Sequence, residues 1–342
     1  MRVLWLSNFT SNHPLEDRMY LQLCAEELQK MNVETVFCHH SPMTIHHRQT
    51  FFEVKWRGFR CIYPMRNLIS TIRAINPNIV LLNSFNTNLM RELEDINREY
   101  PTGVLPHRLT PDLAQFLLNV DCVIAQSMNA KNILETLGCE DITVILPSIG
   151  TRPITECSDP TIVTLSPITP IKNHITLLEA ISLVKHNISD VELAMIGQGN
   201  LKPMCEQMIE LLNLQVKIIS QVSLNTLFRE VRVMALPSFS ETAPLSILES
   251  YARGVPCVVS RSGWGDLFTS ALKANSDNPR EWADHLTNLL SDWDLYDEVR
   301  KNQLSEVKEK FSPGNIKEYV HVFEELDELN RYKIKRIMKK VA

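Results

Sequence analysis

Glycine is scarce in this sequence. The 342 residues include 10 glycines, whereas glycine averages about 7% of residues in proteins. The scarcity matters because α/β folds ordinarily place glycine in their ligand loops. The pair Gly197-Gln-Gly199 is too short for a dinucleotide fingerprint, and no acidic residue follows it about 20 residues later to hold a ribose. A dinucleotide-binding site is therefore not expected at this pair.

The sequence also lacks long apolar runs and paired cysteine motifs. No stretch approaches the ~18 consecutive apolar residues of a membrane-spanning helix, and the N-terminus leads directly into an apolar strand at residues 3–6. We therefore expect a cytoplasmic protein. The eight cysteines are scattered without a Cys-x2-Cys pair, so we interpret them as reduced residues of the core.

A large excess of either charge is absent as well. The net charge is −5, which gives no general attraction to nucleic acid or to an anionic membrane. Hydrophobic residues make up 44% of the chain and charged residues 22%, a composition typical of a packed globular core. A chain of 342 residues is long enough for two domains of ordinary size.

Short apolar runs alternate with helical patterns through most of the chain. Strands that alternate with helices form parallel sheets with right-handed crossovers. The predicted fold class is therefore α/β, with two Rossmann-like parallel-sheet domains that face a cleft and with helices at the C-terminus. The expected strands are residues 3–6, 33–38, 79–83, 121–125 and 142–146 in the first half and residues 161–165, 192–196, 216–219, 233–236 and 256–260 in the second.

A polar segment divides the two halves. Residues 148–160 contain two prolines and one glycine, as a linker does. We expect an N-terminal domain over residues 1–150, a second domain over residues 151–310 and a C-terminal helix over residues 311–342 that packs back on the first domain. Ligands of such folds bind beyond the carboxyl ends of the parallel strands.

Two carboxylates stand out at one of these strand ends. Glu241 lies in the loop after the expected strand 233–236, and Glu249 lies about two helical turns further on. The backbone N–H groups of the first helical turn between them can bind an anion. Carboxylates bind hydroxyls, and the amides beside them bind phosphates. The segment therefore indicates a sugar nucleotide as the ligand. The alternative is a capping carboxylate followed by a solvated helix glutamate.

Four segments of the second half follow one another in a specific order and spacing. They are Leu165-Ser-Pro-Ile-Thr-Pro-Ile-Lys172, Val191 to Leu201, Val216 to Val222 and Val233 to Pro256. Together they resemble the donor-binding domain of retaining glycosyltransferases of family 4, which have the GT-B fold, and Glu241 and Glu249 match that family's Glu-x7-Glu motif. The likeness covers roughly residues 1–310 and in the first half is mainly one of pattern.

The resemblance implies a role for each matching residue. Lys172 would neutralise the donor diphosphate, Glu249 would bind the nucleotide ribose, and Glu241 would contact the transferred sugar. In the first domain, His107 resembles a family histidine near that sugar. The remaining donor-side residues are the backbone N–H groups of Thr242, Ala243 and Leu245, the turn at Gly197, the base-binding strand end at Val222, and Asn12 in the polar loop after the first strand.

The sequence departs from the family pattern at the diphosphate site. Ser166-Pro167 stands where the family has Gly-Arg, so the second diphosphate cation is missing from its usual place. Arg108, Arg152 or Arg261 could replace it, and the sequence does not choose among them. The first loop has Asn12 between a serine and a histidine where the family has Gly-Gly.

The resemblance implies transfer with retention of configuration and no metal or other cofactor, the nucleotide-diphosphate sugar being a co-substrate. Asp292-Trp-Asp294 matches an Asp-x-Asp metal motif, but its charged helical surroundings favour a surface helix start. The intact Lys172, Glu241 and Glu249 favour an active transferase. The alternatives are a weakened homologue that serves as a binding or chaperone subunit of an active transferase and, less favoured, a phosphosugar epimerase.

The acceptor is not readable from the sequence. A glycan, a lipid-linked glycan, a protein or a modified nucleic-acid base would each fit a variable first domain. The chain finishes with the basic amphipathic stretch Lys333 to Lys340, which we interpret either as a solvated terminus or as a weak peripheral contact with anionic lipid.

Overall fold

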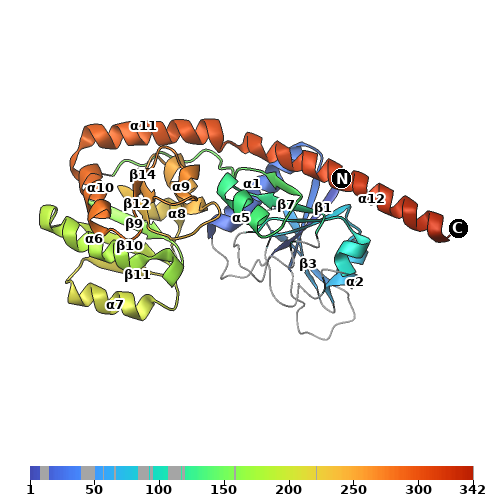
Figure 1. Ribbon diagram of the computed structural model, residues 1–342, viewed down its shortest axis with the longest axis horizontal. Helices are drawn as coiled ribbons and strands as arrows, with labels where there is room; N and C mark the ends of the chain where they lie inside the picture. The colour runs from blue at the N-terminus through green and yellow to red at the C-terminus, as the bar shows by residue number, and fades with distance from the viewer. Residues whose placement is uncertain are drawn as a thin grey trace. The chain divides into compact units, whose positions relative to one another are not determined.

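The structure is a computed structural model that forms two compact units. Unit 1 consists of residues 1–148 and 313–342, and unit 2 of residues 149–312 (Figure 1). The residues that the structure describes are 1–7, 15–39, 51–56, 58–64, 67–83, 92, 95–106, 117, 120–157, 159–220 and 222–341.

Unit 1 is built on an eight-stranded sheet with the order β3-β4-β2-β1-β5-β6-β7-β8. Only β3 and β4 pair antiparallel, and every other neighbouring pair is parallel. The central residues of most parallel strands are apolar and buried, as in strands that are covered on both faces. They are β1 (Arg2–Ser7), β2 (Glu34–His39), β4 (Phe59–Pro64), β5 (Ile79–Leu82), β6 (Thr102–Val104), β7 (Cys122–Ala125) and β8 (Ile142–Val144).

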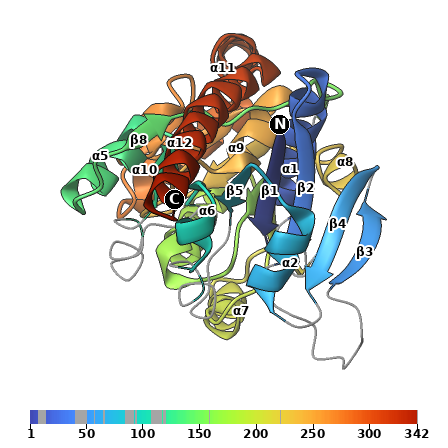
Figure 2. The same cartoon turned by 90° about the vertical axis from the view of Figure 1, so that its right-hand side faces the viewer.

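The hairpin at the sheet edge was not predicted from the sequence. β3 (Phe51–Trp56) pairs with β4 from Phe51 opposite Pro64 to Trp56 opposite Phe59, and the two strands lie side by side at one edge of the sheet (Figure 2). β3 alternates apolar residues with Glu53 and Lys55. This alternation suits an edge strand, whereas buried parallel strands are continuous apolar runs, the pattern on which the strand prediction rests.

Helices cover both faces of this sheet. α2 (Leu68–Ile75) and α5 (Met128–Thr136) contribute buried residues to the core on one face. α1 (Leu15–Lys30) contacts η3 (Pro313–Ile316) and α12 (Lys317–Val341), which belong to the last part of the chain. The Tyr20 and Tyr319 hydroxyls lie 3.0 Å apart in this buried contact. The described part of α12 is therefore part of the core of unit 1.

Unit 2 is built on a six-stranded parallel sheet with the order β11-β10-β9-β12-β13-β14. Numbered from β9, this is the Rossmann order 3-2-1-4-5-6, and the chain reverses direction across the sheet between β9 and β12. β14 was not predicted. The strands are β9 (Thr161–Leu165), β10 (Glu192–Ile196), β11 (Val216–Ile219), β12 (Val233–Leu236), β13 (Cys257–Ser260) and β14 (Leu272–Ala274).

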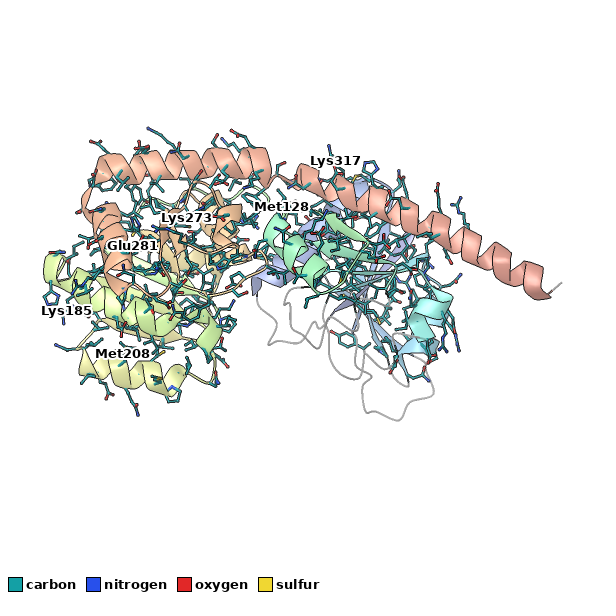
Figure 3. The ribbon with its side chains drawn as sticks, viewed as in Figure 1. Met128, Lys185, Met208, Lys273, Glu281 and Lys317 are labelled. Atoms are coloured by element: carbon teal, nitrogen blue, oxygen red, sulfur yellow. The ribbon has the colours of Figure 1, made fainter. Side chains whose placement is uncertain are left out.

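Two helical layers enclose the second sheet. α6 (His174–Asn187), α7 (Lys202–Leu211) and α10 (Pro279–Ser291) share a core with one face of it. Figure 3 shows α6, which carries Lys185, next to α7, which carries Met208. α11 (Trp293–Lys310) packs against α9 (Leu245–Ala252). The shorter helices are η1 (Pro170–Lys172), α8 (Leu224–Leu227) and η2 (Gly265–Leu267).

The fold confirms the predicted class, two Rossmann-like parallel-sheet domains with C-terminal helices. All eight cysteines are free, and all but the half-buried Cys157 are buried. Burial raises the pKa of the Cys24 thiol to about 12 and that of Cys122 to about 11, so these thiols stay protonated. In the described part of the chain, no helix is long and apolar enough to cross a membrane.

Candidate functional site

The candidate site lies where two loops of unit 2 leave adjacent strands. One loop follows β9 and contains η1 with Lys172, and the other follows β12 and contains Glu241. β9 and β12 are the strands between which the sheet reverses its order. The carboxyl ends at this reversal are the usual ligand position of an open α/β sheet. The topology thus brings Lys172 and Glu241 to that position.

Lys172 and Glu241 form an ion pair across these loops. The Lys172 ammonium donates to the Glu241 carboxylate, and the two side chains are 13% and 12% exposed. Backbone contacts hold the loops together, because the Phe239 N–H donates to the Ile171 carbonyl at 2.9 Å. The Trp264 indole N–H also donates to the Ser238 carbonyl at 3.0 Å. The pair is therefore positioned by a fixed loop structure.

Gly197 and Gly199 let a third loop, after β10, approach the Lys172 loop closely. A Cβ atom at Gly197 would lie 2.1 Å from the Ser166 carbonyl oxygen, and one at Gly199 would lie 2.0 Å from the Ile168 oxygen. The Ile168 N–H donates to the Gln198 carbonyl at 2.9 Å across the same contact. These glycines are needed for backbone packing, whatever further role Gly197 has toward a ligand.

The N-terminus of α9 follows Glu241 directly. Pro244 is its N-cap residue and makes no side-chain hydrogen bond to the helix. Ala243 is buried, while Thr242 and Leu245 are half-buried. The first-turn N–H groups and the positive end of the helix dipole therefore lie in the same loop as the ion pair. This arrangement suits an anionic group such as a phosphate.

Glu249 is held by two arginines. Arg152 donates from Nε to Glu249 Oε2 at 3.0 Å and from Nη2 to Oε1 at 2.9 Å, which is a bidentate pair. Arg253, one turn further along α9, donates from Nη1 to the same Oε2 and to the Glu249 carbonyl. The Glu249 side chain is 4% exposed. Its carboxylate is therefore buried, paired and strongly hydrogen-bonded.

Arg253 is a site residue that the sequence reasoning missed. Its guanidinium is almost fully buried, donates to Asn225 Oδ1 at 3.0 Å and lies over the Phe228 ring at 4.9 Å. Burial lowers the pKa of Arg253, and Glu249 opposes that shift. The i,i+4 spacing of Glu249 and Arg253 was the available signal, since such pairs lie on one helix face.

His174 is a second residue that was missed. It begins α6, two residues after Lys172, and is 1% exposed. Its Nε2 lies 3.2 Å from Ser166 Oγ, and its Nδ1 has no hydrogen-bond partner among the described residues. Burial, with a smaller contribution from the charge of Lys172, lowers the pKa of His174 to about 4. The imidazole is therefore neutral near pH 7.

This buried histidine predicts that acid destabilises unit 2. The pKa of His174 is about 4 in the folded protein and about 6.5 when unfolded. Between these values the unfolded state binds more protons, so stability decreases as the pH falls. From pH 7 to pH 5 we expect His174 to account for a loss of about 2 kcal/mol in the free energy of unfolding. Denaturant unfolding of wild type and His174→Gln at both pH values measures this, and an equal acid loss in the two proteins would contradict it.

The other predicted site residues are spread over the fold or fall outside the described residues. Val222 is half-buried and lies just after β11. Arg261 pairs with Glu281 and is 60% exposed. His107, Arg108 and Asn12 lie outside the described residues, so their predicted roles stay predictions.

The Asp292-Trp-Asp294 motif begins a surface helix, as we predicted. Asp292 is the N-cap of α11, and its carboxylate accepts from the Asp294 and Leu295 N–H groups at 3.0 Å each. Over the residues that the structure describes, no group of three or more His, Cys, Asp or Glu side chains is arranged to hold a metal ion.

Comparisons with known proteins match part of unit 2 to a described family. Residues 159–292 match the model of the family described as glycosyl transferases group 1. The matched part contains Lys172, Glu241 and Glu249. An uncharacterised glycosyltransferase of Methanocaldococcus jannaschii, MJ1607, is 29% identical over 152 residues, which are 41% of this chain and 38% of that protein. The match thus spans well under half of that relative.

Solved structures extend the likeness to both units. Sucrose-phosphate synthase from Thermosynechococcus elongatus aligns with 95% of this chain and 99% of its own at 14% identity and a TM-score of 0.76. The fold is GT-B. Anabaena HepE, solved with UDP and glucose, aligns at 12% identity over 94% of this chain and 98% of its own with a TM-score of 0.74. At these identities the likeness concerns the fold alone.

The family model and the GT-B neighbours together support a place in the GT-B glycosyltransferase superfamily. The pneumococcal O-GlcNAc transferase GtfA, solved with UDP and GlcNAc, is a further neighbour, with 11% identity over 95% of this chain and 99% of its own and a TM-score of 0.73. The family-model match falls within unit 2, the unit that carries the Lys172–Glu241 pair.

Proposed function

We propose that this GT-B protein is a retaining glycosyltransferase that takes a sugar from a nucleotide-diphosphate sugar without a metal ion. The observation that carries the proposal is the Lys172–Glu241 ion pair at the sheet reversal of unit 2. A cation for the diphosphate and an acceptor for sugar hydroxyls lie in contact there. The N-terminus of α9 begins in the same loop as Glu241. These are the groups that the two parts of a sugar nucleotide require.

The proposed roles follow from the charges. Lys172 binds the diphosphate, and the backbone N–H groups of Thr242, Ala243 and Leu245 are directed to its oxygens. Glu241 binds hydroxyls of the transferred sugar, Glu249 binds the ribose, and Val222 lies beside the base. Gly197 keeps its loop close to that of Lys172, as its packing against Ser166 indicates.

The reaction depends mainly on stabilisation of the leaving group. Negative charge develops on the diphosphate as the glycosidic bond breaks, so preorganised cations and amides lower the barrier. A lysine point charge and helix N–H groups supply this stabilisation without a metal. We propose that Glu241 is not a nucleophile, and that the departing phosphate accepts the acceptor's proton on the same face of the sugar. We also propose a cytoplasmic location, and we leave the acceptor open.

A binding screen tests the proposal. UDP-, GDP-, ADP- and CMP-sugars are compared by thermal shift and calorimetry, since a ligand that binds the native state raises stability by RT ln(1 + [L]/Kd). We expect one nucleotide family to bind and the others to bind weakly or not at all. Glu249→Ala should weaken that binding, whereas Glu206→Ala on the exposed face of α7 should leave it unchanged. The proposal fails if no nucleotide sugar binds or if Glu249→Ala binds as tightly as wild type.

A further inference from the structure

The carboxylate of Glu249 has almost no capacity left for another ligand. A carboxylate offers about four lone pairs. Arg152 takes one on each oxygen, and Arg253 takes a second on Oε2. One lone pair remains, on Oε1. A ribose that binds through both its 2′ and 3′ hydroxyls needs two, so the bidentate Arg152 pair and a bidentate ribose exclude one another.

Of the two arginines, Arg152 is the one that can leave. Arg253 belongs to the end of α9, is 2% exposed and is also held by Asn225 and the Glu249 carbonyl. Arg152 lies on a segment without regular secondary structure, and its side chain is 18% exposed. Its other contacts, from Nη1 to the carbonyls of residues 150 and 151, are long, at 3.5 and 3.3 Å.

The segment that carries Arg152 is fixed at both ends. The Ile149 N–H donates to the Phe311 carbonyl at 2.9 Å, and the Thr155 N–H donates to the Arg253 carbonyl at 2.8 Å. Both contacts lie within unit 2. An arginine tethered so closely stays near Glu249 when its side chain leaves, so its competition for the carboxylate is intramolecular.

We propose that Arg152 is a specificity-determining residue that competes with the ribose of the donor for Glu249. Donor binding exchanges the Arg152 guanidinium for the ribose hydroxyls, while Arg253 keeps the carboxylate paired throughout. The affinity for the nucleotide is thus lowered by the pair that binding must break. This inference rests on the proposed function, in which Glu249 binds the ribose.

The direction of the effect separates this role from a merely structural one. Loss of a structural arginine weakens ligand binding or leaves it unchanged, whereas loss of a competitor strengthens it. Arg152→Lys keeps the positive charge that attracts a diphosphate but cannot form the planar two-bond pair. The gain should also depend on the ribose hydroxyls, because only they use the released lone pairs.

The experiment is calorimetric titration of UDP, ADP, GDP and CDP, each with its 2′-deoxy counterpart, into wild type, Arg152→Lys and Arg152→Gln. We expect Arg152→Lys to bind the preferred ribonucleotide roughly tenfold tighter than wild type, since one charge-assisted hydrogen bond to the competitor is lost. Affinity for the 2′-deoxy counterpart should change less. Arg300→Lys on α11, another partly buried arginine whose Glu156 partner lies 3.9 Å away, is the matched control and should bind as wild type does.

Each result decides the matter. The inference is overturned, while the proposed function stands, if Arg152→Lys binds the ribonucleotide no more tightly than wild type does. It is likewise overturned if the ribonucleotide and its 2′-deoxy counterpart gain equally in affinity. Binding of no nucleotide by any of the proteins overturns both. Melting curves establish that each variant is folded, and Arg152→Gln tests the same ribose dependence if the lysine variant melts early.

Discussion

Replacing Lys172 with alanine is expected to reduce sugar transfer by about two to three orders of magnitude, the usual effect of removing one preorganised group that stabilises developing charge. Lys172 is 13% exposed and pairs with Glu241 at the sheet reversal, so its charge acts in a largely desolvated position. The loss should fall mainly on kcat, because the charge on the diphosphate grows as the bond breaks. Steady-state transfer or hydrolysis of the nucleotide sugar that binds in the screen measures it.

Two variants separate this role from general damage. Lys202→Ala removes a lysine of unit 2 that is 45% exposed and pairs with Glu206, and it should keep wild-type activity. Lys172→Arg keeps a cation and should lie between wild type and Lys172→Ala. A Lys172→Ala protein that melts like wild type and retains more than about a tenth of the activity would contradict a charge-stabilising role.

Five of the six strands of unit 2, β9 to β13, were predictable because each is a short apolar run followed by a helix. Strands with other signals were missed. β3 alternates charged and apolar residues, and β6 and β14 have three residues each. Three-residue strands offer too few positions for a period to be recognised, and β8, of the same length, was found because the apolar run continues to residue 146. These segments are strands because they pair with neighbouring strands in the sheet, and the sequence does not reveal that pairing.

The site was predictable only as a set of residue types. Strand order brings Lys172 and Glu241 together, and the resemblance named both residues without their contact. The pairing of Glu249 with Arg152 joins residues 97 positions apart, and no local pattern signals such a pair. His174 follows Lys172 closely, yet its burial depends on packing that the sequence does not state. Long-range contacts of polar side chains are thus the part of the site that the sequence does not predict.

Replacing Arg253 with alanine is expected to cost unit 2 about 3–5 kcal/mol of unfolding free energy, as breaking a buried ion pair does. The guanidinium is 2% exposed and also contacts Asn225 and the Phe228 ring. Its removal leaves the buried Glu249 carboxylate with Arg152 as its remaining guanidinium partner. Denaturant unfolding followed by circular dichroism measures the change.

Much of the cost should come from a buried carboxylate that keeps one guanidinium partner instead of two, and a second substitution tests this. Glu249→Gln in the Arg253→Ala background removes the buried negative charge and should restore part of the stability, since a neutral amide is cheaper to bury than a carboxylate that has lost one of its two partners. Arg261→Ala breaks a pair whose arginine is 60% exposed and should cost less than about 1 kcal/mol. If Arg253→Ala costs no more than Arg261→Ala, then Arg152 alone satisfies Glu249. The contact of Arg253 with Glu249 would then contribute little, and Arg253 would not be the fixed partner on which the exchange of Arg152 for a ribose depends.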